Sequence, residues 1–424
     1  MSELLATAQA HVDFLPPGER AALLTRWAER LARGKETLAT AITAATGKPI
    51  RLSRLEVDRA VGTVDETAKQ LDQLAPRQVD LGDSGRAEIH RVPLGPVLAV
   101  TPFNFPLNLA VHKLAPALLA GCPVLWKPSP KAPGVAEEAL AHLLHAGAES
   151  GIVQVVHLSD EEVLHLVSDP RLAVLTFTGS TAVGHKLQAA TTRAQAVLEL
   201  GGSAAVIIHE ARDRAVAAKQ IAHGACAHAG QVCIAVQRIL TTTDHAAWRD
   251  ALIAAFNAVP TGEPWDDHTL CGPVVDEASK QRIQGELDGM VARGGRILCG
   301  GTWHGRILAP TLIDGLPASD PALRDRELFA PIAALIPCNG IDAALTVAED
   351  TPYGLNTGLY ASDEAIIATA FARLSVGTLV INDVPTRRDD RLPYGGVKAS
   401  GNGREGAFAA LGHFTTSKVL WRAG

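Results

Sequence analysis

The sequence has few aromatic residues, few methionines and no concentration of one charge sign. Phe, Trp and Tyr make up 4% of its 424 residues, and it contains two methionines. The formal net charge is −6 at pH 7, and no run of Lys and Arg has the density of a nucleic-acid-binding patch. No apolar segment is long enough to cross a bilayer, and the first residues lack the pattern of a signal peptide. We therefore expect a cytoplasmic protein that binds neither nucleic acid nor a membrane.

Cysteines are also sparse and scattered. None of the six belongs to a C-x-x-C pair, and no group of Cys and His has the spacing of a zinc site. In a cytoplasmic chain of this size we expect neither disulfides nor a bound metal. Most such cysteines are small buried hydrophobic residues, so a functional one must be distinguished by its surroundings. The six are Cys122, Cys226, Cys233, Cys271, Cys299 and Cys338.

Chain length and hydrophobic pattern predict an α/β fold with more than one core. Residues 17–80 have the apolar spacing of helices, one of them from about Ser53 to Leu74. A buried strand is expected at residues 97–101, after which strands and helices alternate to about residue 200. A second alternating set follows to about residue 393, in which residues 213–230 form one predicted helix. Such alternation predicts doubly wound parallel sheets.

Three side chains could carry a reaction, and each has a plainer alternative. Cys233 follows a turn containing Gly230, where backbone N–H groups can lower a thiol pKa and stabilise an oxyanion, although buried packing is the better local interpretation. Glu199 ends an apolar strand, where parallel sheets place their ligands, but it could equally face solvent. Asn104 lies between aromatic and proline residues and is either an oxyanion donor or a turn residue.

Two further segments could bind phosphate or ribose groups. Gly179, Ser180 and Gly184 lie between a strand and a helix, where the N-terminal amides of the helix point outward. Many strand–helix turns have this composition. Lys127 ends another strand, and an isolated lysine there is more often simply solvated.

The order of these features along the chain is more specific than any one of them. In this order and spacing the sequence resembles the aldehyde dehydrogenase superfamily from about residue 17 to its end. The strongest matches are PFNFP, KPS, FTGST, ELGG, GQVC, ELFAP, NTGLYASD and PYGGVKASGNGREG.

The resemblance implies a role for each of the reactive side chains. Cys233 matches the nucleophile that attacks an aldehyde. The attack gives a thiohemiacetal on this residue, which is then oxidised to a thioester. Asn104 and the backbone N–H of Cys233 match the oxyanion donors. Glu199 matches the general base that activates water for hydrolysis. Family members that transfer the acyl group to coenzyme A usually lack this glutamate, so a free carboxylic acid is the expected product.

The resemblance also implies a nicotinamide cofactor and a domain arrangement. The family's fold is α/β, with a Rossmann-like cofactor domain (residues 1–82 and 97–200), a catalytic domain (201–400) and oligomerisation strands (83–96 and 407–424). A homodimer or homotetramer is therefore expected. Glu327 and Phe329 match the pair that positions the nicotinamide ribose and ring. The full set matching cofactor contacts is Thr101, Pro102, Phe103, Lys127, Ser129, Pro130, Gly179, Ser180, Gly184, Leu200, Glu327 and Phe329.

Two positions depart from the family pattern. NAD-preferring members often have a glutamate where this chain has Pro130, and such a carboxylate would repel a 2′-phosphate. Its absence permits NADP without excluding NAD, so the cofactor is NAD or NADP. The ELFGP pattern is ELFAP here, with Ala330 in place of glycine, which is expected to alter that turn slightly.

The predicted substrate is a small aldehyde. Segments around Asn104, Cys233 and PYGG are similar to those of a subgroup that acts on lactaldehyde, glyceraldehyde phosphate and phosphonate- or sulfonate-bearing aldehydes. His112 and Arg388 are the candidate substrate contacts, with Arg388 facing an anionic group. The alternative is that Arg387, Arg388 and Arg391 pair with Asp389 and Asp390 on the surface. For the activity itself, the alternatives are a coenzyme A-acylating dehydrogenase and a catalytically silent protein of this fold.

Overall fold

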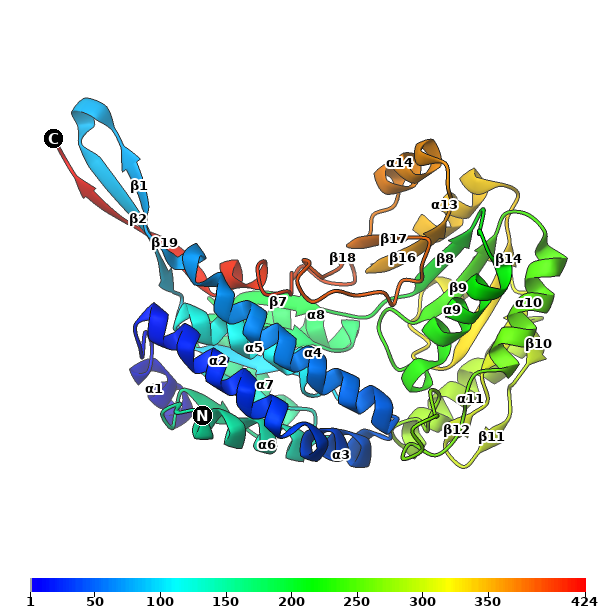
Figure 1. Cartoon of the computed structure of the whole chain (residues 1–424), viewed down its shortest axis with the longest axis horizontal. Coiled ribbons are helices and arrows are strands. Elements are labelled where there is room, and N and C mark those ends of the chain that lie inside the picture. The colour runs from blue at the N-terminus through cyan, green and yellow to red at the C-terminus, as the bar shows by residue number, and fades with distance from the viewer. Residues whose placement is uncertain (1) are drawn as a thin grey trace.

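The computed structural model describes residues 2–424, which form two sheet-containing bodies and a projecting arm (Figure 1). A five-stranded sheet lies in one body, a seven-stranded sheet lies in the other, and three further strands build the arm. The predicted α/β class with two doubly wound parallel sheets is confirmed. The predicted domain boundaries remain a prediction. No described helix is both long and apolar enough to cross a membrane.

The five-stranded sheet is parallel throughout, with the order β5-β4-β3-β6-β7. Successive residues of its central strand alternate between two hydrophobic cores, because side chains of a strand point to opposite faces. Val97 and Ala99 join the core under one set of helices, and Leu98 and Val100 join the core under the other. Its strands are β3 (Val97–Val100), β4 (Val124–Lys127), β5 (Val153–Val155), β6 (Val174–Thr178) and β7 (Gln195–Glu199).

Helices pack on both faces of this sheet. The expected helix from Ser53 to Leu74 begins earlier and is shorter, because α4 ends at Ala68 and a 3-10 turn, η1 (Lys69–Leu74), follows it. Every residue of α5 is buried, and Gly121 ends the helix in the left-handed region. The helices are α1 (Ser2–Ala10), α2 (Pro17–Arg33), α3 (Lys35–Thr46), α4 (Ile50–Ala68), α5 (Asn108–Ala120), α6 (Pro133–His145), α7 (Asp160–Ser168) and α8 (Thr181–Ala190).

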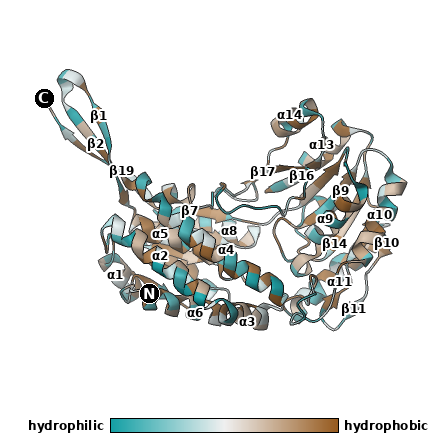
Figure 2. Cartoon of the chain, in the orientation of Figure 1, coloured by the Kyte–Doolittle hydropathy of each residue, from teal (hydrophilic) through white to brown (hydrophobic). Residues whose placement is uncertain are grey.

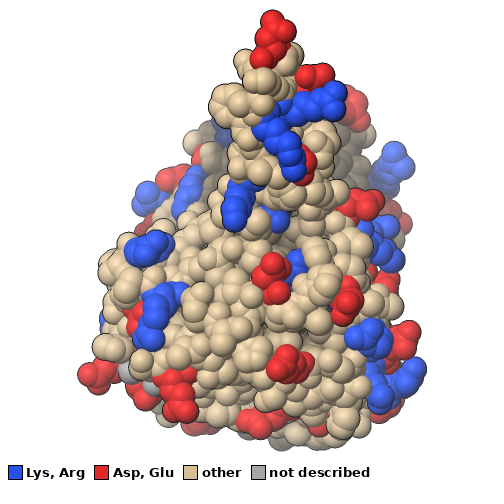
Figure 3. Space-filling model, turned by 90° about the vertical axis from the view of Figure 1, so that its left-hand side faces the viewer, with Lys and Arg blue, Asp and Glu red and all other residues tan. Residues whose placement is uncertain are grey.

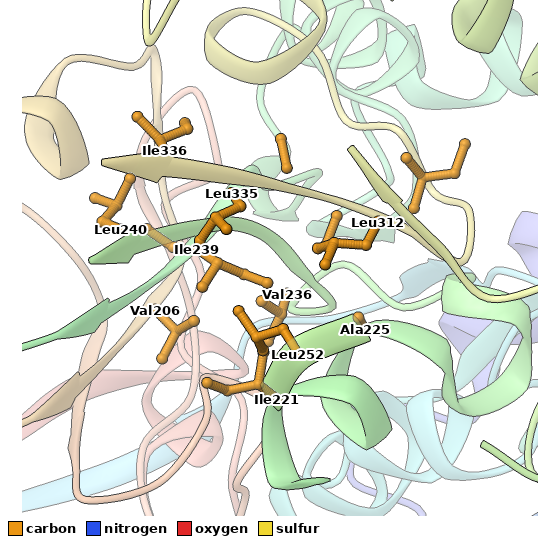
Figure 4. Close-up of a cluster of buried hydrophobic side chains, with 14 of the residues drawn as sticks. Val206, Ile221, Ala225, Val236, Ile239, Leu240, Leu252, Leu312, Leu335 and Ile336 are labelled. Carbon is orange, nitrogen blue, oxygen red and sulfur yellow. The ribbon is translucent and has the colours of Figure 1, made fainter. Parts of the chain in front are cut away.

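The seven-stranded sheet has the order β10-β13-β14-β9-β8-β16-β17, and only β10 runs antiparallel to its neighbour. Its central strands are apolar, whereas the helices around them have both polar and apolar faces (Figure 2). Val206, Ile239 and Leu335 point into a common core with Ile221 and Leu252 of the covering helices (Figure 4). The strands are β8 (Ala204–Ile208), β9 (Val236–Thr241), β10 (Arg296–Cys299), β13 (Thr311–Asp314), β14 (Ile332–Pro337), β16 (Asn356–Tyr360) and β17 (Thr378–Ile381).

Smaller elements complete this body. They are two short antiparallel strand pairs, β11 (Trp303–His304) with β12 (Ile307–Leu308) and β15 (Tyr353–Gly354) with β18 (Val397–Lys398). The helices are α9 (Arg214–Cys226), α10 (His245–Asn257), α11 (Glu277–Ala292), α12 (Pro321–Arg324), α13 (Ile341–Glu349) and α14 (Glu364–Arg373).

The single helix predicted for residues 213–230 is wrong beyond Cys226. There α9 ends, and the following 3-10 turn, η3 (Ala227–Gly230), has left-handed φ values of 53° at His228 and 54° at Ala229. Gly230 is also left-handed, and a Cβ on it would lie 2.1 Å from the carbonyl oxygen of Ala330. The close approach therefore requires glycine, and the reversal carries the chain toward Cys233.

The arm consists of β1 (Arg77–Asp80), β2 (Arg86–Pro93) and β19 (Thr415–Arg422), antiparallel in the order β1-β2-β19. Predicting helices for all of residues 17–80 was thus wrong at β1, which pairs along β2 and belongs to the arm. The arm projects from the body at one end of the molecule (Figure 1). Viewed from that end, the body beneath the arm has a broad area with few charged side chains (Figure 3).

Candidate active site

Two hollows meet at Cys233. One is a cavity of about 240 Å³ between α4, the η3 turn and the 386–394 segment. The other is a groove along the ends of β3, β4, β6 and β7. The groove has two adjoining parts of about 410 and 450 Å³, which share Pro102, Phe103 and residues 178–180. Cys233 and Leu109 line both the cavity and the nearer part of the groove. A group on this thiol could therefore be reached from either side.

The thiol of Cys233 has one polar side-chain partner among the described residues, Tyr394. The distance from Cys233 Sγ to Tyr394 Oη is 3.3 Å. The Cys233 carbonyl lies so close to Gly202 that a Cβ there would approach it within 2.5 Å, which constrains the backbone at Cys233. Burial raises the pKa of the Cys233 thiol to about 12, and the hydrogen bond with Tyr394 opposes this shift.

Asn104 is tied to the segment that carries Cys233. Its side-chain Nδ2 donates to the carbonyl of Gln231 (2.9 Å), and its Oδ1 accepts from the backbone N–H of Phe105 (3.1 Å). The side chain is buried and lines the groove together with Cys233. An amide has two N–H donors, so one remains for a further acceptor near the thiol.

Glu199 is buried at the end of β7, but its carboxylate lines neither hollow. It packs against the backbone of Gly395 and Gly403, and neither carboxylate oxygen finds a hydrogen-bond partner within residues 2–424. Burial raises the pKa of Glu199 well above 4.5, and the neighbouring charge of Glu405 raises it further. The structure thus brings Cys233 and Asn104 together and leaves Glu199 behind them.

Most of the residues predicted to contact the cofactor line the groove. The exception is Gly184, which instead lets α8 pack closely, since a Cβ there would lie 2.4 Å from Leu200 Cδ2. Gly179 likewise has no room for a Cβ beside the ring of Phe177. The groove-lining members are Thr101, Pro102, Phe103, Lys127, Ser129, Pro130, Gly179, Ser180, Leu200, Glu327 and Phe329.

Glu327 and Phe329 close the groove beside Cys233. Glu327 accepts a long hydrogen bond from the backbone N–H of Gly202 (3.4 Å), and burial raises its pKa to about 7. Phe329 has a left-handed φ of 49°, and its ring meets the ring of Phe103 edge-on with the centroids 6.1 Å apart. Ala330, the departure from the family pattern, is buried in the large core, and its carbonyl is the one that approaches Gly230.

The cavity on the other side of Cys233 is walled by charged side chains. Lys48 and Glu56 form a buried ion pair, and the Lys48 ammonium lies 3.7 Å from the centroid of the Phe105 ring. One Glu56 oxygen also accepts from the backbone N–H groups of Leu107 (2.9 Å) and Asn108 (3.1 Å) at the start of α5. This carboxylate anchors the segment that carries Asn104.

Arg388 is the arginine of its segment that lines this cavity. Its guanidinium lies 3.8 Å from the centroid of the Tyr394 ring, and its nitrogens approach Asp390 (3.1 Å) and Glu405 (3.3 Å). Asp390 also accepts a two-pronged contact from Arg59 (3.0 and 2.8 Å). Neither Asp390 nor Glu405 lines the cavity, so the cationic partners face it and the anionic partners lie behind.

The remaining predicted substrate contacts are elsewhere. His112 is buried behind Arg388, with Nε2 3.0 Å from an Arg388 nitrogen and 3.1 Å from Asp390, and it does not line the cavity. Arg387 and Arg391 are exposed and pair with Asp383 and Asp389. Surface pairing thus describes these two arginines but not Arg388.

Sequence reasoning missed several residues of the cavity wall. Lys48, Glu56 and Arg59 come from a helical region far from the motifs, and no local pattern marks them. His228 and Tyr394 lie inside or next to the GQVC and PYGG motifs, so their positions were available as a signal.

Comparisons with known proteins agree on one family. The profile of the "Aldehyde dehydrogenase family" matches residues 4–420. The 3-sulfolactaldehyde dehydrogenase of Priestia aryabhattai is 33% identical over 411 residues, covering 95% of this chain and 86% of that protein. The lactaldehyde dehydrogenase of Methanococcus aeolicus is 32% identical over 431 residues, covering 99% and 91%. A solved structure, glyceraldehyde-3-phosphate dehydrogenase of Methanocaldococcus jannaschii complexed with NADP, has a TM-score of 0.95 at 29% identity, covering 100% and 94%.

Proposed function

The chain belongs to the aldehyde dehydrogenase family, and we propose that Cys233 is the nucleophile of its reaction. That reaction is the oxidation of an aldehyde to a carboxylic acid with NAD or NADP. The observation that carries the assignment to Cys233 is its position in the wall shared by the cavity and the groove. A substrate in the cavity and a cofactor in the groove would meet at this one thiol.

In the first step, the Cys233 thiolate attacks the aldehyde carbon and forms a thiohemiacetal. The free N–H of Asn104 and the backbone N–H of Cys233 stabilise the developing oxyanion. The tether from Asn104 to Gln231 supports this role, because it holds the amide beside the segment of the nucleophile. Within the described chain, the backbone N–H of Cys233 donates to no other group, so it is available as the second donor.

The groove fits a nicotinamide dinucleotide. Glycine positions that cannot accept a Cβ shape it, and α8 begins directly after the Gly179-Ser180 turn, as anion-binding helix starts do. The adenosine end would lie along Lys127 and Ser129, and the nicotinamide end beside Glu327 and Phe329. A bound nicotinamide would supply the hydride acceptor at this end of the groove, so that the thiohemiacetal on Cys233 could be oxidised to a thioester.

Glu199 then activates the water that hydrolyses the thioester. Because its carboxylate lies against Gly395 and Gly403, this step requires the side chain to turn toward Cys233. Its raised pKa makes the carboxylate a stronger base than an exposed one once it has lost its proton.

The substrate is a small aldehyde with an anionic group. Lys48, Arg59 and Arg388 face the cavity, whereas Glu56 is the carboxylate among the residues that line it. This charge arrangement favours an anion. Two relatives are named for aldehydes of this kind, 3-sulfolactaldehyde and glyceraldehyde 3-phosphate. Arg388 is the proposed contact, because its guanidinium lies 3.8 Å from the centroid of the Tyr394 ring, whose hydroxyl contacts the Cys233 thiol.

A homodimer or homotetramer is the proposed assembly, formed through the arm. In the described chain β19 pairs only with β2, so its outer edge is open. Val419, Leu420 and Trp421 are all exposed on that strand, and Trp421 is 61% exposed. An open apolar edge strand tends to pair with another chain. The cytoplasm remains the proposed location, since all six cysteines are free, as in a reducing compartment.

One assay tests the proposed function. Absorbance at 340 nm is followed with a panel of short aldehydes, both cofactors, and coenzyme A present or absent, for the wild type and for Cys233→Ala. We expect turnover by the wild type alone, with the free acid as product whether or not coenzyme A is present. Retained turnover by Cys233→Ala would overturn the role of this thiol. Acyl-coenzyme A as product would instead identify an acylating dehydrogenase, and no turnover with any aldehyde would indicate a silent protein.

A further inference from the structure

The Tyr394 hydroxyl lies against the reactive atom of the proposed mechanism without a role in it. Its Oη is 3.3 Å from Cys233 Sγ. The ring belongs to a small buried cluster with Ile234 and Leu355, against which Val232 and Cys233 pack. A phenylalanine would fill this space equally well, so packing does not explain the hydroxyl.

Contacts hold both the backbone and the ring of Tyr394. The backbone N–H of Tyr394 donates to the Glu405 carbonyl (2.9 Å), and the Glu405 N–H donates to the Tyr394 carbonyl (2.6 Å). The Arg388 guanidinium covers the ring at 3.8 Å from its centroid. A cation over the ring withdraws electron density and makes the phenol O–H a better donor. Arg388 is thus a positioning residue for this hydroxyl, in addition to its proposed contact with substrate.

The direction of the hydrogen bond follows from the form of the thiol that reacts. A thiolate carries no proton, so toward the reactive form only the hydroxyl can donate. We propose that Tyr394 is a catalytic residue whose hydroxyl donates a hydrogen bond to the Cys233 thiolate and stabilises it in the substrate cavity. The inference rests on the proposed role of Cys233 as nucleophile.

The proposal involves no proton transfer through the tyrosine. The thiol proton leaves to solvent, the phenol keeps its own proton, and the hydrogen bond persists until sulfur forms its bond to the aldehyde carbon. The hydroxyl matters because burial works against the thiolate and raises the pKa of Cys233. Burial also holds the pKa of Tyr394 well above 10, so the phenol remains a donor at neutral pH.

The test is the rate of alkylation of Cys233 by iodoacetamide at pH 8, measured on its own peptide by mass spectrometry. In Tyr394→Phe, loss of a hydrogen bond to a charged acceptor should raise the pKa of Cys233 by about one to two units. Because a more basic thiolate is also more nucleophilic, the expected slowing is smaller, about 3- to 15-fold. The rate of the first cofactor-reduction burst should fall by a similar factor, whereas thioester hydrolysis should not change.

Tyr360→Phe is the matched control. Tyr360 is also buried, but its hydroxyl donates to Gln220 (2.9 Å) in the seven-stranded body. Alkylation of Cys233 should be unchanged in this variant. If Tyr394→Phe and Tyr360→Phe have equal melting temperatures and bind the cofactor equally well, slower alkylation in Tyr394→Phe reflects the chemistry of its hydroxyl and not a change in structure.

A second measurement makes the Tyr394 hydroxyl a stronger hydrogen-bond donor instead of removing it. The chain has three tyrosines, so all can be replaced by 3-fluorotyrosine, whose phenol is more acidic. Cys233 alkylation should then become faster in the wild-type background and stay unchanged in the Tyr394→Phe background. Identical alkylation rates for Tyr394→Phe and the wild type would overturn the inference. If alkylation of wild-type Cys233 leaves turnover intact, the proposed function itself fails.

Discussion

The two hollows that meet at Cys233 are built in different ways. The groove consists of strand ends and glycine turns, each formed by residues close together in the sequence, such as residues 101–103, 127–131 and 177–187. The cavity is assembled from α4, the start of α5, the η3 turn and the 386–394 segment. Its wall contains the buried Lys48–Glu56 ion pair, and the partly buried Arg59–Asp390 pair joins α4 to the 386–394 segment. Backbone geometry therefore shapes the groove, the proposed cofactor side, whereas side-chain charge shapes the cavity, the proposed substrate side.

The point where the hollows meet should respond most strongly to mutation. Asn104→Ala removes the proposed oxyanion donor, so kcat should fall by about 100- to 1,000-fold with little change in KM. Steady-state kinetics with one aldehyde would measure both constants. Asn257→Ala, at the exposed end of α10, serves as the control. A mutant whose KM alone changed would indicate that Asn104 only helps to bind substrate.

Charge on the cavity side should discriminate between substrates. Arg388→Gln should lower kcat/KM for an aldehyde with a terminal anion by about 10- to 100-fold, because a charge-assisted hydrogen bond is lost. A neutral aldehyde of the same length should lose much less, and Arg388→Lys should recover part of the difference. Arg391→Gln, which disrupts an exposed pair, should leave both substrates unaffected. Equal losses for the two aldehydes would mean that Arg388 does not recognise the anion.

Buried charges behind the cavity should set the pH dependence of hydrolysis. As the proposed general base, Glu199 would act only above its own pKa, so the rate of hydrolysis should be lost as the pH falls through that value. Glu405 raises the pKa of Glu199, and Lys113 lowers it. The acidic limb should therefore move to lower pH in Glu405→Gln and to higher pH in Lys113→Met, by about 0.5–1 unit each. Movement in the same direction in both variants would point to general disruption instead.

The groove should show the smallest effect, since backbone dominates it. Pro130→Glu places a carboxylate at the adenosine end and should lower kcat/KM with NADP relative to NAD by about 3- to 10-fold. Pro130→Gln has nearly the same size without the charge and should leave the ratio unchanged. If the two variants behave alike, the side chain at position 130 acts through shape and not through charge.

The same contrast explains how much could be predicted from the sequence. Groove residues such as Gly179 and Phe329 belong to continuous motifs, so the family resemblance of those motifs pointed to them. Lys48 and Arg59 reach the cavity only because α4 packs along α5 and the 386–394 segment folds over it, and no local pattern reports such packing. Likewise, the left-handed residues His228 and Ala229 lead into Gly230, which packs against the carbonyl of Ala330 about a hundred residues away. Helical periodicity does not report this long-range contact, so it continued the helix too far.

Side-chain orientation was the hardest feature to predict. The position of Glu199 at a strand end was predicted, but its packing against Gly395 and Gly403 was not, because those glycines come from the far end of the chain. His112 was a candidate substrate contact, but its ring contacts Arg388 and Asp390 and does not line the cavity. Tyr394 lies inside the PYGGVKASGNGREG motif, but only the 3.3 Å distance from its hydroxyl to the Cys233 thiol points to a role for that hydroxyl.

The central claim, that Cys233 carries the acyl group between the two hollows, is tested most directly with Glu199→Gln in a rapid-mixing experiment. Without its base, the thioester should accumulate. The account predicts a burst of one reduced cofactor per subunit, followed by slow turnover, with the acyl mass found on the peptide containing Cys233. No burst, or an acyl group on another cysteine, would contradict the account.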